Sequence, residues 1–295
     1  MNFDNSWEAV LKPGQATIYF DVLSDTKFEA GENSYSRINA WWLAELCRLV
    51  YRQGGDELKE RAPGPTRKEV LAAVRLDEVD FFNEGDTEAA LIKPIDSSAD
   101  QFAALILRGT NDPRDWLTNF NAIPKRWAGG GLVHKGFAKA LGLVWDKVTA
   151  SLARNVPSDC PLFIAGHSLG AALALLAGSL RRPRALYTFG CPRVGDDDFG
   201  ATLSGVNVFR VVNNRDVVTT VPPPVPFHHV GQLHYITHAG GLVVAPDDET
   251  VAADRLKRDR LSFSSLDFSK LFTDAPEFLA DHAPVNYVAH LERQV

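Results

Sequence analysis

The sequence predicts an α/β fold in which helices flank a central, mostly parallel sheet. Strand-like and helix-like segments alternate along the chain. Residues 161–165 form a short, wholly apolar run, which is typical of a strand buried on both faces. Hydrophobic residues make up 45% of the chain and charged residues 23%, as in ordinary globular proteins. Because no composition shift divides the 295 residues, we expect one domain over residues 1–295.

Capping and periodicity define the first elements. Residues 36–53 predict a helix, because Ser36 can cap it and apolar residues recur behind it at helical spacing. Residues 54–67 are rich in glycine, proline and charge, and they predict a loop. Three strands are expected next, at residues 76–82, 87–93 and 102–108, with a hairpin turn at 83–86.

The later elements continue the alternation. Residues 134–154 form the clearest amphipathic helix, and residues 169–180 predict a buried helix that Pro183 ends. The remaining strands are expected at 185–189 and 206–212, with a hairpin at 230–237 and 241–245 and two short helices near 268–279 and 284–293.

Charge and composition exclude several classes of protein. The net charge of −6 argues against a nucleic-acid partner, which would need a basic face. Cys47, Cys160 and Cys191 lie far apart and form no CxxC, so no disulfide framework is expected. The first ten residues lack a signal-peptide pattern, and the longest apolar stretch, 171–177, is too short to span a bilayer. We therefore expect a cytoplasmic protein, although a removed leader or export without one stays open.

One segment has the pattern of a nucleophile. Gly166-His167-Ser168-Leu169-Gly170 fits G-x-S-x-G and lies between the apolar strand and the buried helix. This context suits a serine on a strained bend with its hydroxyl exposed, and the two glycines allow close backbone approach there. The alternative is that Ser168 only caps the helix, as most serines before an apolar run do.

A nucleophilic serine needs a base and a carboxylate that orients the base. In hydrolases with this motif the chain order is serine, acid, histidine. Asp216 follows the strand at 206–212 and is the candidate acid. The alternatives are that Asp216 is a solvated turn residue, or that the acid is Asp196, Asp197 or Asp198.

Eight histidines compete for the role of base. The chain order excludes His134 and His167, which precede Ser168. His282 is preferred because it lies in an expected loop ahead of a helix, where catalytic groups are common. His290 falls within that helix and is predicted to face solvent.

The other four histidines raise the alternative of a metal site. His228, His229, His234 and His238 lie in one segment, and three of them have the even spacing of one strand face. No cysteine or nearby carboxylate joins them before Asp247, so no metal is expected.

Acyl transfer also needs hydrogen-bond donors for an oxyanion. One is expected at the backbone N–H of Leu169. The other is expected at Thr110, because Gly109 permits a sharp bend after the strand at 102–108. The alternative is an ordinary turn at a strand end.

At these residues the sequence resembles the fungal-type, or class 3, lipases of the α/β-hydrolase fold. Segments that match the motifs of this family occur through most of the chain, in the same order as in the family. They are Arg108-Gly109-Thr110 with Asp115-Trp116, residues 133–137, 166–170 and 188–196, residues 210–216 with Val221-Pro222-Pro223, His229-Val230-Gly231, and Asp281-His282 with Tyr287.

The resemblance implies a catalytic triad of Ser168, Asp216 and His282, with an oxyanion hole at Thr110 and Leu169. It implies hydrolysis of acylglycerols or similar carboxylic esters, as by a triacylglycerol lipase, with no metal or organic cofactor. A non-lipase esterase, a phospholipase and an inactive lipase-like binding protein remain alternatives.

The resemblance also implies a short mobile lid after the oxyanion strand. Residues 111–127 are the candidate, in which Trp116, Leu117 and Phe120 could cover the site in water and open at a lipid–water interface. A packed surface loop is the alternative. Secreted fungal members carry disulfides, and this chain has no evident set.

Overall fold

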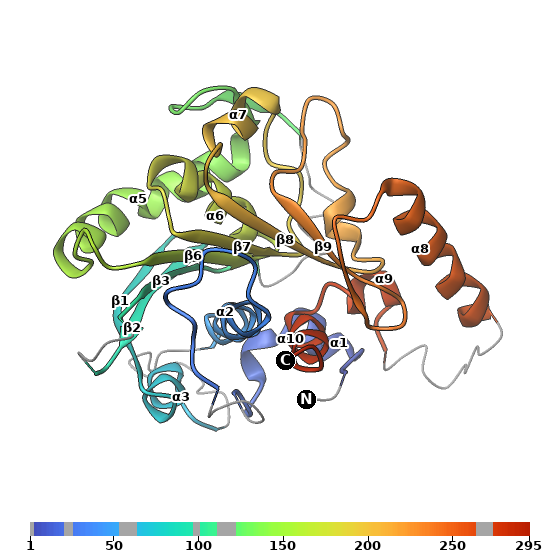
Figure 1. The fold of residues 1–295 in the computed structure, drawn as a ribbon, viewed down its shortest axis with the longest axis horizontal. Helices are drawn as coiled ribbons and strands as arrows, with labels where there is room; N and C mark the ends of the chain where they lie inside the picture. Colours follow the sequence, from blue (N-terminus) through green and yellow to red (C-terminus); the bar gives the residue numbers. More distant parts are fainter. Residues whose placement is uncertain (1–2, 21–25, 53–63, 97–100, 111–121, 264–273) are drawn as a thin grey trace.

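An eight-stranded sheet forms the centre of the molecule (Figure 1). The computed structural model describes residues 3–20, 26–52, 64–96, 101–110, 122–263 and 274–295. In spatial order the strands are β1 (Leu76–Glu84), β2 (Thr87–Pro94), β3 (Ala103–Leu107), β6 (Leu162–His167), β7 (Ala185–Phe189), β8 (Asn207–Asn213), β9 (Gln232–Ile236) and β10 (Leu242–Val244). Each strand lies within two residues of its predicted bounds.

The middle of the sheet is parallel, as predicted. β3, β6, β7, β8 and β9 pair in parallel, whereas β1, β2 and β3 pair antiparallel, as do β9 and β10. β3, β6 and β7 are buried along their whole length, in agreement with their apolar sequences. Parallel strands end at one edge of a sheet, so the segments that follow β3, β6, β7 and β8 meet there.

Helices cover both faces of the sheet (Figure 1). α5 (Lys135–Asn155) and α6 (Leu169–Leu180) pack on one face, and α2 (Arg37–Leu49) and α10 (Pro284–Glu292) pack on the other. Each face has its own apolar core. This arrangement confirms the predicted α/β fold.

The predicted helix starts agree with the structure. Ser36 caps α2, because its Oγ accepts a hydrogen bond from the backbone N–H of Asn39 at 2.9 Å. α2 ends at Leu49, earlier than predicted. α6 has the predicted bounds and is buried from Gly170 to Gly178.

Within the described residues, four α-helices and one hairpin are not predicted by the sequence patterns. They are α1 (Trp7–Leu11), α3 (Arg67–Ala73), α7 (Asp197–Thr202), α8 (Asp248–Phe263), and β4 (Pro124–Arg126) paired with β5 (Leu132–His134). The first three are short and depend on local caps, such as the capping box of Thr66 and Glu69 at α3. α8 is polar around its circumference, so no apolar period marks it.

The C-terminal segment differs from the prediction in two ways. The helix expected near 268–279 is α9 (Glu277–Ala280) in the described part of the chain, which leaves out residues 264–273. His290 was expected to face solvent and this is wrong, because the residue is only 8% exposed. Its ring packs on Phe3 with the centroids 4.4 Å apart, since the N-terminal segment covers this side of α10.

The candidate lid is only partly described. Trp116, Leu117 and Phe120 lie outside the described residues. Near the end of the segment at 111–127, β4 is exposed and pairs with β5. Among the helices that the structure describes, none is long and apolar enough to cross a membrane.

Candidate active site

Ser168 lies on the bend between β6 and α6. Its φ of +60° is in the left-handed region, which is strained for a residue other than glycine. Its backbone N–H donates to the carbonyl of Phe189 on β7 at 2.9 Å. The side chain makes no capping hydrogen bond, and Oγ has no hydrogen-bond partner among the described residues although Ser168 is only 1% exposed. Helix capping therefore does not explain this serine.

Close packing at the bend requires glycine. A Cβ on Gly166 would lie 2.1 Å from the carbonyl oxygen of Gly170, and a Cβ on Gly170 would lie 2.0 Å from that of Leu107. A Cβ on Gly109 would lie 3.0 Å from the Cβ of Ser168. The bend therefore packs against the end of β3, and Thr110 follows directly after this contact.

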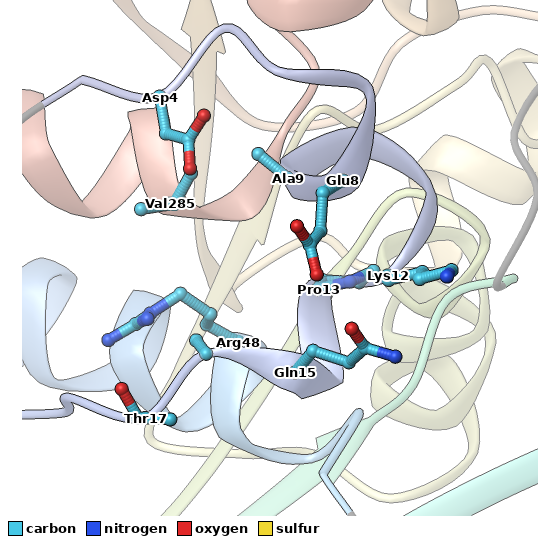
Figure 2. A pocket seen from close by; sticks show the side chains of 10 residues that line it. Asp4, Glu8, Ala9, Lys12, Pro13, Gln15, Thr17, Arg48 and Val285 are labelled. Atoms are coloured by element: carbon cyan, nitrogen blue, oxygen red, sulfur yellow. The ribbon is translucent and has the colours of Figure 1, made fainter. Parts of the chain in front are cut away.

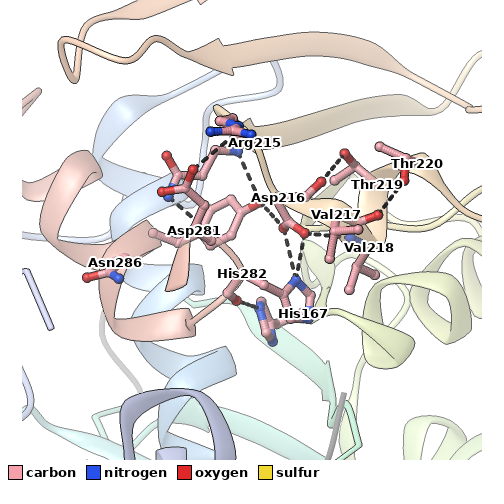
Figure 3. A network of polar contacts seen from close by, with 12 residues as sticks. His167, Arg215, Asp216, Val217, Val218, Thr219, Thr220, Asp281, His282 and Asn286 are labelled. Atoms are coloured by element: carbon pink, nitrogen blue, oxygen red, sulfur yellow. Dashed lines mark hydrogen bonds and ion pairs between the residues drawn. The ribbon is translucent and has the colours of Figure 1, made fainter. Parts of the chain in front are cut away.

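Asp216 and His282 meet at the same edge of the sheet (Figure 3). Nδ1 of His282 lies 3.0 Å from Oδ1 and 2.9 Å from Oδ2 of Asp216. Both side chains are buried. Oδ1 also accepts from the backbone N–H of Val218 at 2.9 Å, and Oδ2 accepts from the hydroxyl of Tyr287 at 2.6 Å.

These contacts favour a charged Asp216 carboxylate. Burial raises the pKa of the Asp216 carboxyl, but the charge and hydrogen bond of His282 and the hydrogen bond of Tyr287 outweigh burial and lower the pKa below its usual value. Burial also raises the pKa of the Tyr287 hydroxyl well above its usual value, so that this group stays a donor.

The carboxylate determines which nitrogen of His282 carries the proton. Nδ1 faces an acceptor and must donate, which leaves Nε2 as an acceptor when the ring is neutral. Nε2 is buried and has no hydrogen-bond partner within the described ranges. The site thus holds an unpaired hydroxyl on Ser168 and an unpaired acceptor on His282.

Residues 189–190 connect these groups. The carbonyl of Phe189 accepts from Ser168, and Gly190 follows it with φ of +60°. A Cβ on Gly190 would lie 2.6 Å from Oδ2 of Asp216 and 3.0 Å from Nδ1 of His282. Only glycine leaves room for both side chains at this point.

His167 supports the backbone of His282. Its Nε2 lies 2.7 Å from the carbonyl oxygen of His282, so Nε2 donates, and its Nδ1 accepts from the hydroxyl of Tyr51 at 3.1 Å. Burial, together with the neighbouring His282, lowers the pKa of His167 to about 3. His167 is therefore neutral near pH 7 and has a fixed tautomer.

Asp281 joins the segment of the acid to that of the histidine (Figure 3). Its carboxylate accepts from the backbone N–H of Arg215 at 3.1 Å, and its carbonyl accepts from Nδ2 of Asn213 at 3.0 Å. The residues next to Asp216 and His282 are thus hydrogen-bonded to each other.

The rival carboxylates have other roles. Asp196 caps α7, because its Oδ1 accepts from the backbone N–H of Phe199 at 2.9 Å, and it also accepts from that of Leu132. Asp197 is exposed and hydrogen-bonds to His228. Neither contributes to the Asp216–His282 pair.

The four histidines considered as metal ligands, His228, His229, His234 and His238, have different partners in the structure. His229 donates from Nε2 to the carbonyl of Thr219 at 2.9 Å, and His238 lies 2.5 Å from Asp254. The ring of His234 stacks on Tyr35 with centroids 3.7 Å apart. No group of three or more potential metal ligands occurs in the described part of the chain.

A cavity of about 260 Å³ lies beside the N-terminal segment (Figure 2). Ser168 is not among the residues that line it. Acidic Asp4 and Glu8 and basic Lys12 and Arg48 line it. The two negative and two positive side chains balance, so the lining offers no net formal charge to a ligand.

Tyr51 has no recognisable signal in the sequence. It lies at the end of α2, and its contact with His167 spans 116 residues. Such a contact depends on how α2 packs on the sheet, which no local motif describes.

Comparisons with known proteins identify related lipases. The family model of lipase (class 3) matches residues 104–225. The chain is 33% identical over 150 residues to a lipase of Rhizomucor miehei, covering 45% of this chain and 41% of the relative. It is 37% identical over 132 residues to secreted mono- and diacylglycerol lipase 1 of Fusarium solani, covering 40% and 38%. The solved structure of the Rhizomucor miehei triacylglyceride lipase matches with a TM-score of 0.52 and 30% identity, over 59% of this chain and 71% of that one.

The chain belongs to the fungal-type class 3 lipase family. It spans about two fifths of the length of the two curated relatives named here. The segment that matches the family model contains Thr110, Ser168 and Asp216, and His282 lies beyond it. The fold of this class 3 lipase is that of the α/β-hydrolases, as the sequence motifs predict.

Proposed function

We propose that this class 3 lipase hydrolyses carboxylic esters of the acylglycerol type, as a triacylglycerol lipase does. Ser168 is the nucleophile, His282 the base and Asp216 the orienting carboxylate. The buried Asp216–His282 contact carries the proposal, because it leaves Nε2 of His282 as an unpaired acceptor at the edge where the strained Ser168 lies. The names of the two relatives, a lipase and a mono- and diacylglycerol lipase, support acylglycerols as the substrate class.

The proposed reaction has two acyl-transfer steps. Nε2 of His282 takes the proton of Ser168 as Oγ attacks the ester carbonyl, and Asp216 stabilises the imidazolium that forms. The backbone N–H groups of Leu169 and Thr110 stabilise the oxyanion. The alcohol leaves with the proton from His282, and an acyl-serine remains. Water then gives a proton to His282 and attacks the acyl-serine, which releases the acid and regenerates Ser168.

The central test replaces the nucleophile. Ser168→Ala is expected to abolish turnover of a panel of esters of graded chain length and to leave the far-UV spectrum unchanged. Ser204→Ala, at an exposed serine away from the site, is the matched control and should retain full activity. Retained turnover in Ser168→Ala would refute the assignment.

Two further arms of the experiment separate the alternatives. A serine-directed phosphonate should label the wild type and fail to label Ser168→Ala, whereas an inactive binding protein would not be labelled at all. A phospholipid in the ester panel distinguishes a phospholipase from an acylglycerol lipase by relative turnover.

The proposed partner of the enzyme is a lipid–water interface, which the candidate lid at 111–127 would contact. The rate is expected to rise sharply when a sparingly soluble ester exceeds its solubility limit. A smooth curve through that limit would contradict interfacial opening and leave the hydrolytic mechanism intact.

A further inference from the structure

In the part of α8 whose side chains are described, residues 248–257, Asp254 and Arg255 hydrogen-bond to the rest of the molecule. The helix lies at the edge of the molecule beyond β9 (Figure 1). In its middle Leu256 is 61% exposed, whereas Asp254 is only 7% exposed. A buried carboxylate needs partners, and the partners of Asp254 connect α8 to the active-site edge.

The carboxylate of Asp254 receives four hydrogen bonds. Its Oδ2 accepts from Nδ2 of Asn214 at 3.0 Å, from the hydroxyl of Tyr235 at 3.1 Å and from the backbone N–H of His238 at 2.8 Å. Its Oδ1 lies 2.5 Å from Nδ1 of His238. All four partners act as donors, and a carboxylate is the side chain that only accepts.

Asn214 is held by α8 at two points. Its side-chain amide donates to Asp254, and its carbonyl accepts from Nε of Arg255 at 2.8 Å. Two further contacts come from β9. The carbonyl of Ile236 accepts from the backbone N–H of Asn214 at 2.9 Å, and the hydroxyl of Tyr235 accepts from the side-chain amide of Asn214 at 2.9 Å.

The backbone of Asn214 needs this support. The residue is fully buried, and its φ of +27° lies outside the ordinary regions for a residue with a side chain. A strained conformation persists when its surroundings determine it from several sides. Asn214 lies two residues before Asp216, so the direction in which the chain leaves β8 depends on it.

We propose that Asp254 is a positioning residue for the ester hydrolysis proposed above: by holding Asn214, it sets the place of Asp216 against His282. The inference rests on that proposed function. Asp254 contacts neither Ser168 nor His282 in any described hydrogen bond, so its effect passes through the turn at residues 213–216. Small misplacements of catalytic groups cost up to roughly a hundredfold in rate.

The test compares Asp254→Asn with Glu249→Gln, an exposed residue on the same helix. An asparagine at 254 turns an NH₂ group toward the existing donors and weakens the hold on Asn214. With a water-soluble p-nitrophenyl ester we expect Asp254→Asn to lower kcat about tenfold at unchanged KM. Glu249→Gln should keep the wild-type kcat and KM. An unchanged kcat in Asp254→Asn would overturn the proposal.

A double-mutant cycle separates positioning from general destabilisation. Asp216→Asn alone should lower kcat by roughly 10⁴. In that background Asp254→Asn is expected to have no further effect on kcat, because the carboxylate through which it acts is gone. An equal fold loss in both backgrounds would show a role independent of Asp216 and would overturn the proposal.

Tyr235→Phe provides a milder variant if Asp254→Asn folds poorly. It removes one donor to Asp254 and one acceptor of Asn214 while keeping the buried ring. We expect a two- to fivefold loss of kcat, which should likewise vanish in the Asp216→Asn background. Failure of the two proposals is distinguishable: turnover in Ser168→Ala would refute the function, whereas an inactive Ser168→Ala beside a fully active Asp254→Asn would refute only the role of Asp254.

Discussion

Asp216 shows at the residue scale how a buried charge is stabilised. Three donors surround its carboxylate: the backbone N–H of Val218, the hydroxyl of Tyr287 and Nδ1 of His282. The chain order of the motifs predicts Asp216 and His282, and the local sequence predicts the bend at Ser168. The contribution of Tyr287 comes from a contact across 71 residues, which only folding creates.

Tyr287→Phe should lower both activity and stability. The change removes a hydrogen bond to a charged group and leaves the backbone N–H of Asn213, now 3.0 Å from the hydroxyl, without its acceptor. We expect a loss of about 2 kcal/mol in the free energy of unfolding and a fall of about tenfold in kcat. Urea unfolding and ester kinetics measure the two effects.

Tyr35→Phe is the matched control for that variant. The buried hydroxyl of Tyr35 has no hydrogen-bond partner among the described residues, so its removal should leave the stability unchanged or raise it. Equal losses of stability and of kcat in Tyr287→Phe and Tyr35→Phe would contradict a specific role for the Tyr287 hydroxyl.

At the element scale, the crossing of α6 and β3 positions the bend of Ser168. The sequence predicts both elements, because each has a continuous apolar surface bounded by turn residues. It also places small residues at the start of α6. The closeness of the crossing is visible only in the structure, where Gly170 faces the carbonyl of Leu107.

Gly170→Ala should therefore destabilise the protein. The added Cβ would lie 2.0 Å from a backbone oxygen that cannot move alone, so β3 and α6 must separate. We expect a cost of about 1–3 kcal/mol in the free energy of unfolding, and a loss of activity because Thr110 follows β3. Urea denaturation with parallel ester assays checks both.

Gly142→Ala tests the same substitution without the close contact. Gly142 is exposed on α5, and a Cβ there meets nothing within 4 Å. This variant should be more stable than the wild type by about 0.5–1 kcal/mol, because alanine favours the helix. A similar loss in the free energy of unfolding for Gly142→Ala and Gly170→Ala would contradict the steric explanation.

At the scale of the whole molecule, buried neutral histidines link stability to pH. Burial, with His282 nearby, lowers the pKa of His167 to about 3, and burial, with Arg210 and Arg193 nearby, lowers that of His229 to about 3. Both groups have an ordinary pKa of 6.5 in the unfolded chain. Below pH 6.5 the unfolded state binds protons that the folded state does not. The free energy of unfolding therefore decreases as the pH is lowered.

Between pH 6.5 and pH 4.5, each of these two histidines is expected to lower the free energy of unfolding by about 2 kcal/mol. Urea unfolding at several pH values in this window measures it. His229→Gln keeps a donor toward the carbonyl of Thr219 and removes one titrating group, so it should reduce the pH-dependent loss over this window by about 2 kcal/mol. A stability that does not change over this window would contradict the neutral state of both rings.

The sequence by itself determines the sheet, the main covering helices and the serine–acid–histidine order, because these depend on local periodicity, caps and short motifs. It does not determine α8 or the buried place of His290, because a polar helix has no apolar period and burial depends on what packs from elsewhere. The sequence also prefers His282 among the eight histidines, and the structure shows that its ring contacts Asp216. Only the tertiary structure decides that Tyr51, Asp254 and Tyr287 hydrogen-bond to the side chains of His167, Asn214 and Asp216, since hydrogen bonds between distant residues form only when the packed sheet and helices bring their donors and acceptors together.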